Sequence, residues 1–96
     1  MKFNITAAGY LHIPAEEAVR FPTGTAIALV RGDELWIMPM SHLGSGGLLL
    51  KIRNSRGDRS IFIQKLLPEG VPSGVRDVAW DEQNIAFRIP LFYSNH

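Results

Sequence analysis

The 96-residue sequence contains no cysteine, which excludes a disulfide scaffold and any metal site built from thiolates. It has no apolar run near the roughly 20 residues that a membrane-spanning helix needs. Its first residues also lack the long apolar core of a signal peptide. We therefore expect a cytoplasmic protein without a membrane partner. A chain of this length is too short for a second independent core, so residues 1–96 are expected to form one domain.

Residue patterns typical of a catalytic or metal centre are also missing. The three histidines, His12, His42 and His96, show no spacing typical of metal ligands. The tripeptide Gly44-Ser45-Gly46 is one residue too tight for a nucleophile motif, and it precedes an expected strand instead of a helix. We therefore expect no metal, no cofactor and no catalysis. A small enzyme of unknown reaction is the third-ranked hypothesis.

The chain has no large net charge, since its formal charge is +1 at pH 7. The charges are nevertheless distributed unevenly. Residues 41–65 contain five cations and one carboxylate, whereas residues 66–84 contain four carboxylates and one cation. The basic segment is either a solvated surface or a binding patch, and a solvated surface is the default interpretation because exposed ion pairs contribute only about 0–1 kcal/mol each.

What the sequence does contain is a series of short, alternating apolar segments separated by turns. Strands are expected at residues 2–6, 10–13, 25–30, 34–38, 48–54, 59–67, 75–80 and 85–91. Pro14 opens a short helix near residues 14–21, and Pro22 ends it. This pattern predicts a mostly β fold, a small sandwich or barrel of two hairpins plus a C-terminal strand.

A glycine-rich linker at residues 41–47 is expected to separate a first half, residues 1–40, from a second β half, residues 48–96. The glycines of this linker could alternatively cradle a phosphate. That arrangement normally leads into a helix, whereas a strand is expected to follow here, so we favour the linker. Trp36 and Trp80 are expected in the core or in a dimer interface.

The tripeptide Arg-Gly-Asp, which adhesion proteins present to integrins, occurs at residues 31–33 and 56–58. Each copy lies where two alternating apolar segments meet. Tight hairpins need a positive φ, which glycine adopts at little cost, so Gly32 and Gly57 are expected in hairpin turns. With neither cysteines nor a signal peptide, integrin binding is not expected.

The hairpin around the second copy is the best candidate for a binding site. Four of its cations, Lys51, Arg53, Arg56 and Arg59, are expected on one exposed ribbon. Such a ribbon could enter a DNA or RNA groove or contact an acidic protein. The alternative is a solvated outer face whose charges keep an edge strand from pairing with other chains.

Three features of the first half carry a family resemblance. Residues 9–14 read GYLHIP, residues 22–25 read PTGT, and residues 28–39 read ALVRGDELWIMP. With the short helix between the first two, this order resembles the AbrB/MraZ-type swapped-hairpin domain over residues 1–40. The resemblance implies a homodimer of interlocked hairpins. It also implies DNA binding through arginines, of which the short helix here offers Arg20.

The leading hypothesis is a non-catalytic β-rich interaction or accessory module, a homodimer with an unknown protein partner. The absence of converging reactive groups and the resemblance to a dimerising fold motivate it. The alternative is an AbrB-like transcriptional regulator that binds DNA through Arg20 and the hairpin at residues 51–59. It ranks second because Glu16 and Glu17 in the short helix would repel phosphates.

Overall fold

The alternating segments pair into two antiparallel sheets in a computed structural model that describes residues 1–42 and 46–93. The strands are β1 (Lys2–Ile5), β2 (Tyr10–Ile13), β3 (Thr25–Arg31), β4 (Glu34–Pro39), β5 (Leu48–Leu49), β6 (Lys51–Ile52), β7 (Arg59–Phe62), β8 (Gly74–Asp77), β9 (Ala79–Asp81) and β10 (Ala86–Pro90). A helix, α1 (Ala15–Ala18), and a 3-10 turn, η1 (Gln64–Leu66), complete the elements.

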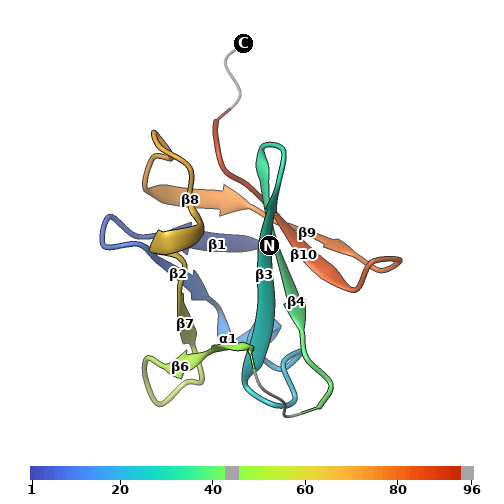
Figure 1. Ribbon diagram of the computed structural model, residues 1–96. Coiled ribbons are helices and arrows are strands. Elements are labelled where there is room, and N and C mark those ends of the chain that lie inside the picture. The colour runs from blue at the N-terminus through green and yellow to red at the C-terminus, as the bar shows by residue number, and fades with distance from the viewer. Residues whose placement is uncertain (43–45, 94–96) are drawn as a thin grey trace.

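Sheet A has the strand order β6-β7-β2-β1-β8 and sheet B the order β5-β3-β4-β10-β9 (Figure 1). The predicted mostly β fold is confirmed. Of the two expected architectures, the structure is a sandwich of two open sheets and not a closed barrel. No helix in the described part of the chain has the length and apolar character needed to span a membrane.

Side chains alternate along the strands, and one set from each sheet fills the space between the sheets. Leu11 and Ile13 of β2 are fully buried, as are Leu35 and Ile37 of β4. Phe87 of β10 lies at the centre of an aromatic cluster, with ring centroids 5.1 Å from Phe3, 5.7 Å from Phe21 and 4.7 Å from Trp80. This core fixes which side chains each sheet presents outward.

Two expected strands are each divided between the two sheets. The segment predicted at residues 48–54 leaves sheet B after β5 and enters sheet A as β6, and the segment at 75–80 passes from β8 to β9. The residue at each crossing, Leu50 or Val78, is buried and donates its amide to a backbone carbonyl 2.8 Å away. A strand that crosses in this way serves as the short edge of both sheets.

The other expected elements differ from the structure mainly at their ends. The strand predicted at residues 59–67 ends at Phe62, and Gln64–Leu66 form the turn η1 between Ile63 and Leu67, which both pack in the core. The helix is shorter than the predicted 14–21, although Arg20 and Phe21 continue it with backbone bonds to residues three positions earlier. Both hairpin glycines have the expected positive φ, 59° at Gly32 and 98° at Gly57.

One charged side chain lies inside the sandwich. Arg76 of β8 is only 2% exposed, and its guanidinium donates to the Pro90, Gly74 and Leu91 carbonyls at 2.8–2.9 Å. It also donates to the Tyr93 hydroxyl at 2.9 Å, with the guanidinium carbon 4.5 Å from that ring. Arg76 therefore joins β8 to the end of β10 as a structural residue, a role that its sequence context did not indicate.

Candidate binding surfaces

The five cations that the sequence predicts as a binding site differ in their surroundings. Lys51 and Arg53 are exposed at the edge of sheet A. Arg56 is paired with Asp58, with 3.0 Å between Nη2 and Oδ2, and Arg59 reaches the Leu50 carbonyl at 3.4 Å. Two of the four hairpin cations are therefore engaged within the chain.

Asp58, the acidic residue of the second Arg-Gly-Asp copy, has a structural role. Its Oδ1 accepts the Ala15 amide at 2.9 Å, which attaches the hairpin tip to the start of α1. Its Oδ2 accepts the Asn54 side-chain amide at 2.9 Å. These bonds, that of Asn54 foremost, lower the pKa of Asp58, and Arg56 adds to the effect. The tripeptide therefore holds the hairpin to the helix.

Arg20, the fifth predicted cation, stacks on a tryptophan of sheet B. Its guanidinium carbon lies 4.3 Å from the centroid of the Trp80 ring, a cation–π geometry. Trp80 belongs to β9 in sheet B, whereas Lys51 and Arg53 belong to the edge of sheet A. Arg20 thus stacks on a ring of sheet B, whereas the hairpin tip is bound to the start of α1.

The outer face of sheet A is largely polar. Tyr10 and Phe62 are opposite each other on β2 and β7, with ring centroids 5.0 Å apart. His12, on the same face of β2, has a lowered pKa because partial burial and then the charge of Arg53 disfavour its protonated form. Lys51 is paired in register with Ser60, opposite His12. This face combines cations with one aromatic pair.

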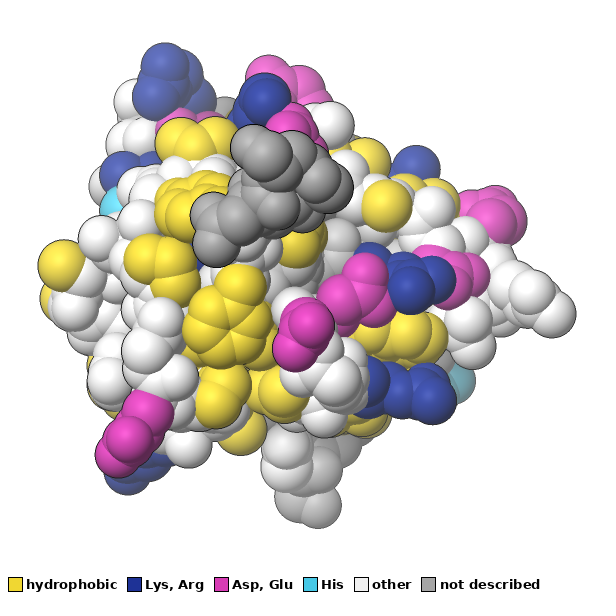
Figure 2. Space-filling view, turned by 90° about the horizontal axis from the view of Figure 1, so that it is seen from above, with side chains coloured by type: hydrophobic (Ala, Val, Ile, Leu, Met, Phe, Trp, Pro, Cys, Tyr) yellow, Lys and Arg dark blue, Asp and Glu magenta, His cyan; other side chains and the backbone are white. Residues whose placement is uncertain are grey.

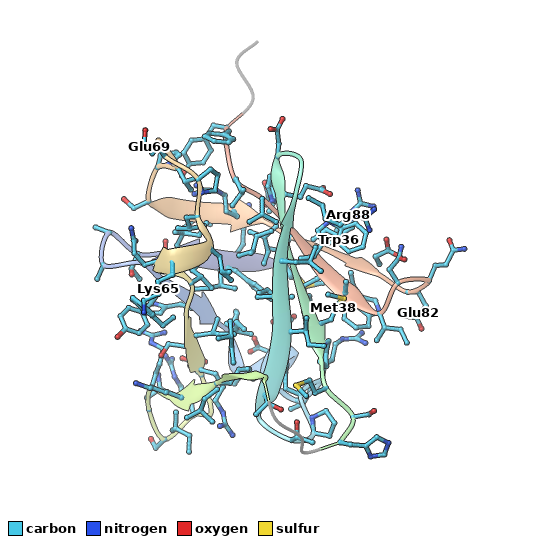
Figure 3. All side chains as sticks on the ribbon, viewed as in Figure 1. Trp36, Met38, Lys65, Glu69, Glu82 and Arg88 are labelled. Carbon is cyan, nitrogen blue, oxygen red and sulfur yellow. The ribbon has the colours of Figure 1, made fainter. Side chains whose placement is uncertain are left out.

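The outer face of sheet B has an apolar part on β3 and β4. Ile27 lies opposite Met38, and Leu29 lies opposite Trp36, so that two pairs of large side chains cover neighbouring strands. We call these four residues the β3–β4 face. Ile27 is 48% exposed, whereas Trp36 is only 8% exposed. Figure 3 shows Trp36 and Met38 along β4, with Arg88 beside Trp36.

Charged side chains of both signs surround Trp36. Arg31 and Arg88 lie with their guanidinium carbons 4.5 and 5.1 Å from the centroid of its ring. Arg88 is bound to Glu34 at 2.8 Å and contacts Asp81 at 3.4 Å. The bond to Glu34 raises the pKa of Arg88 further above its usual value. The border of the β3–β4 face thus carries both signs of charge, with Arg88 bound to carboxylates and Arg31 outside the ion pairs of the described residues.

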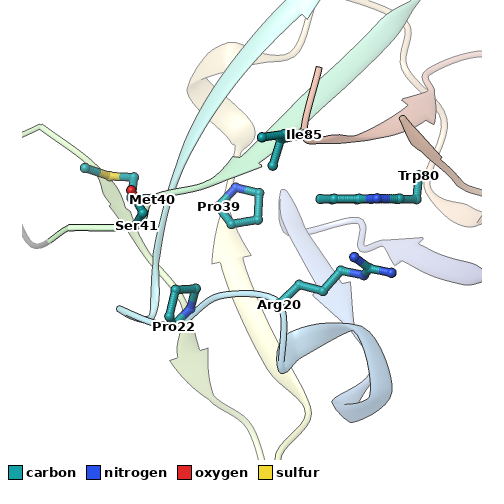
Figure 4. A pocket seen from close by; sticks show the side chains of 7 residues that line it. All are labelled: Arg20, Pro22, Pro39, Met40, Ser41, Trp80 and Ile85. Carbon is teal, nitrogen blue, oxygen red and sulfur yellow. The ribbon is translucent and has the colours of Figure 1, made fainter. Parts of the chain in front are cut away.

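A groove lies where the chain between α1 and β3 meets the ends of β4 and β10. It has a volume of about 300 Å³ and is lined by Arg20, Pro22, Pro39, Met40, Ser41, Trp80 and Ile85. Figure 4 shows the Trp80 ring and Ile85 on one side of Pro39, with the Arg20 guanidinium next to the ring. We call this the Trp80 groove. Trp80 is thus half-buried against the core and also lines a groove that the sequence did not indicate.

Ile85, at the edge of this groove, has an unusual backbone conformation. Its φ is 51°, in the left-handed region that β-branched residues rarely adopt, and its side chain is 59% exposed. The turn that holds it is fixed by Asp81, whose carboxylate accepts the Asn84 amide at 3.0 Å and the Asn84 side chain at 2.9 Å. The chain therefore presents an apolar side chain to solvent from a strained position.

No cluster of three or more metal-ligating side chains occurs among residues 1–42 and 46–93. His42 is exposed, while His96 and the Gly44-Ser45 part of the predicted linker lie outside the described residues. Seen from the end of the sandwich in Figure 2, cationic and anionic side chains are intermingled around a cluster of hydrophobic ones. This face shows no extended field of one charge.

Comparisons with protein-family models, with curated proteins and with solved structures find no match to this chain. The resemblance of residues 1–40 to the AbrB/MraZ-type domain stays a prediction. The surfaces described above are therefore interpreted from their own geometry and chemistry.

Proposed function

We propose that this chain is a non-catalytic interaction module that forms a homodimer through the β3–β4 face. The observation that carries the proposal is the pair of cross-strand contacts, Ile27 with Met38 and Leu29 with Trp36, on the outer side of an antiparallel sheet. The outer face of such a sheet is polar when it is solvated. Contiguous apolar side chains at this position are typical of a protein–protein contact.

The border of the face supports a second copy of the chain as the occupant. A two-fold contact brings the same surface of both copies together, so each charge on the border meets the border of the partner. Here Arg31 and Arg88 stand beside Glu34 and Asp81. A border with both signs of charge can pair with itself, whereas a border of one sign would repel its own copy. This contact does not require the exchange of hairpins.

Sedimentation equilibrium of the wild-type protein tests the proposal. We expect a dimer with a dissociation constant on the order of 10 μM, as for a small, partly apolar interface. Ile27→Asp should give a monomer. Ile52→Asp is the matched control, because Ile52 is an exposed isoleucine in sheet A. A wild-type monomer at about 100 μM would overturn the proposal, as would equal effects of the two substitutions.

A second candidate function, nucleic-acid binding, is supported by the outer face of sheet A. The Tyr10–Phe62 pair offers rings on which bases can stack, with Lys51 and Arg53 near them for phosphates. Fluorescence anisotropy with a labelled single-stranded oligonucleotide and a matched duplex at low salt tests this candidate. Binding should weaken as salt rises and should fall in the double variant Lys51→Gln, Arg53→Gln. Absence of binding to both nucleic acids would exclude this function and the AbrB-like alternative with it.

A further inference from the structure

We infer that the Trp80 groove is a binding site for a peptide segment of a partner protein in which an acidic residue stands next to a large apolar one. The site is separate from the β3–β4 face, so the inference does not depend on the homodimer. It rests on three properties of the groove, which are the charge of Arg20, the apolar character of the other lining residues and the conformation of Ile85.

The charge of the groove favours a carboxylate. Arg20 is the only charged residue that lines it. None of the ion pairs formed within residues 1–42 and 46–93 includes Arg20, whereas Arg56 and Arg88 both have carboxylate partners. Glu82 is bound to the indole N–H of Trp80 instead. Stacking on Trp80 fixes the guanidinium in place, and its planar fork of donors matches a carboxylate.

The rest of the groove favours an apolar side chain beside that carboxylate. Pro22, Pro39 and Met40 are apolar, and Trp80 presents an aromatic surface. Ile85 adds a further apolar side chain from a residue with a φ of 51°. Such strained conformations are concentrated at functional sites, where the surrounding structure maintains them. Here the Asp81–Asn84 bonds hold the turn that keeps Ile85 at the groove.

The openness of the groove favours a peptide over a free small molecule. Small-molecule sites commonly enclose about 70–90% of the ligand surface. None of the seven lining residues of the Trp80 groove is buried, so a ligand would remain open to solvent on one side. A volume of about 300 Å³ is suited to one or two side chains of a longer chain that continues outside the groove.

A peptide titration followed by ¹H–¹⁵N NMR tests the inference on the intact chain. The probe is acetyl-Gly-Leu-Glu-Gly-amide, and the matched control replaces its Glu by Gln. The sequence contains two tryptophans, so the indole signal of Trp80 reports on the groove while that of Trp36 is an internal reference. We expect the Trp80 signal to shift with a dissociation constant on the order of 1 mM and the Trp36 signal to stay in place.

Both the Gln peptide and the variant Arg20→Gln should weaken binding about fivefold, as expected for one exposed charge pair. Arg31→Gln, which removes a guanidinium stacked on Trp36 instead, should leave the affinity unchanged. No shift of Trp80 at about 5 mM peptide would overturn the inference, as would equal affinity for the Gln peptide.

Tighter binding of 4-phenylbutyrate than of the peptide would identify a small-molecule site, and a Trp80 shift caused by protein concentration alone would identify a second copy. Either result would contradict the inference that a peptide of a partner protein occupies the groove.

Discussion

The β3–β4 face and the Trp80 groove are both partly exposed apolar surfaces at which arginine stacks on a tryptophan, but their charges differ. At the face, Arg88 is bound to Glu34 and contacts Asp81. At the groove, Arg20 is stacked on Trp80 and takes part in none of the ion pairs of the described residues. The border of the face thus holds two arginines beside two carboxylates, whereas the groove is lined by one arginine and no carboxylate.

This difference indicates different occupants for two surfaces of similar composition. A surface whose border holds arginines and carboxylates in balance gains most from burying apolar area, and a second copy offers such area. A surface with an available guanidinium gains specificity from a carboxylate. The balance of arginines and carboxylates at each surface, more than the number of apolar side chains, therefore distinguishes the proposed functions. Four changes to the chain test this comparison.

The largest effect is expected from Ile27→Asp. A carboxylate in the middle of the β3–β4 face would have to be desolvated in the homodimer without a partner, so the dimer dissociation constant should rise about 100-fold or more. The affinity of the Trp80 groove for the Leu-Glu peptide should not change. Sedimentation equilibrium and the peptide titration measure the two quantities. A parallel loss of both would show that the surfaces are one site.

A smaller effect on the same face is expected from Glu34→Gln. Glu34 Oε1 accepts bonds from Arg88 at 2.8 and 3.0 Å and from the Trp36 indole at 3.2 Å. Removing its charge leaves an excess of cations on the border of both copies, so dimerisation should weaken about tenfold. Because this loss comes from like-charge repulsion, added salt should reduce it. If the weakening of the dimer did not depend on salt, the balance of charge at the border could not be its cause.

At the groove, Ile85→Gly should separate stability from binding. Glycine removes the strain of a left-handed β-branched residue, about 1–2 kcal/mol, and loses part of that gain to its greater freedom in the unfolded chain. We expect the free energy of unfolding to rise by about 0.5–1 kcal/mol. Peptide binding should weaken about threefold through the lost apolar contact. Urea unfolding measures the first quantity, and unchanged or reduced stability would contradict the strain at Ile85.

The smallest effect concerns Asp81, which connects the two surfaces through Arg88 and Asn84. Hydrogen bonds from Asn84 first, and then Arg88, lower the pKa of Asp81. A carboxyl with a lower pKa in the folded state stabilises the fold above its unfolded pKa, about 3.9, and this contribution is lost as pH falls through the folded value. Asp81→Asn should therefore be less stable than wild type at neutral pH, and the difference should vanish in acid. Thermal unfolding from about pH 7 to about pH 2.5 measures it, and a constant difference would be inconsistent with the lowered pKa.

The sequence predicted the strands and turns well because period-two patterns and glycines act locally. Gly32 and Gly57 are in the positive-φ turns that alternation on both sides of them indicates. The crossings at Leu50 and Val78 could not be predicted, because an apolar residue within a strand has the same pattern whether the strand continues or changes sheet.

The candidate sites were harder to predict, because they depend on contacts between distant residues. A basic segment in the sequence does not reveal that Asp58 binds both Arg56 and the start of α1. Arg20 appeared to belong with the basic hairpin, yet its partner Trp80 is sixty residues away along the chain. In the sequence, Ile27 and Leu29 alternate with smaller residues, but this pattern does not tell which of the two sets faces outward. Ile85 has a left-handed backbone conformation, whereas the sequence pattern predicts an ordinary strand residue at this position.

One dilution series tests the central claim, that the β3–β4 face and the Trp80 groove have different occupants. Protein labelled at the isoleucine δ1 methyls is diluted from about 300 μM to about 10 μM without peptide and followed by ¹H–¹³C NMR. The Ile27 methyl should move as the homodimer dissociates. The methyls of Ile85, at the groove, and of Ile52, in sheet A, should stay in place. A fixed Ile27 signal with a moving Ile85 signal, or no movement at all, would contradict the account.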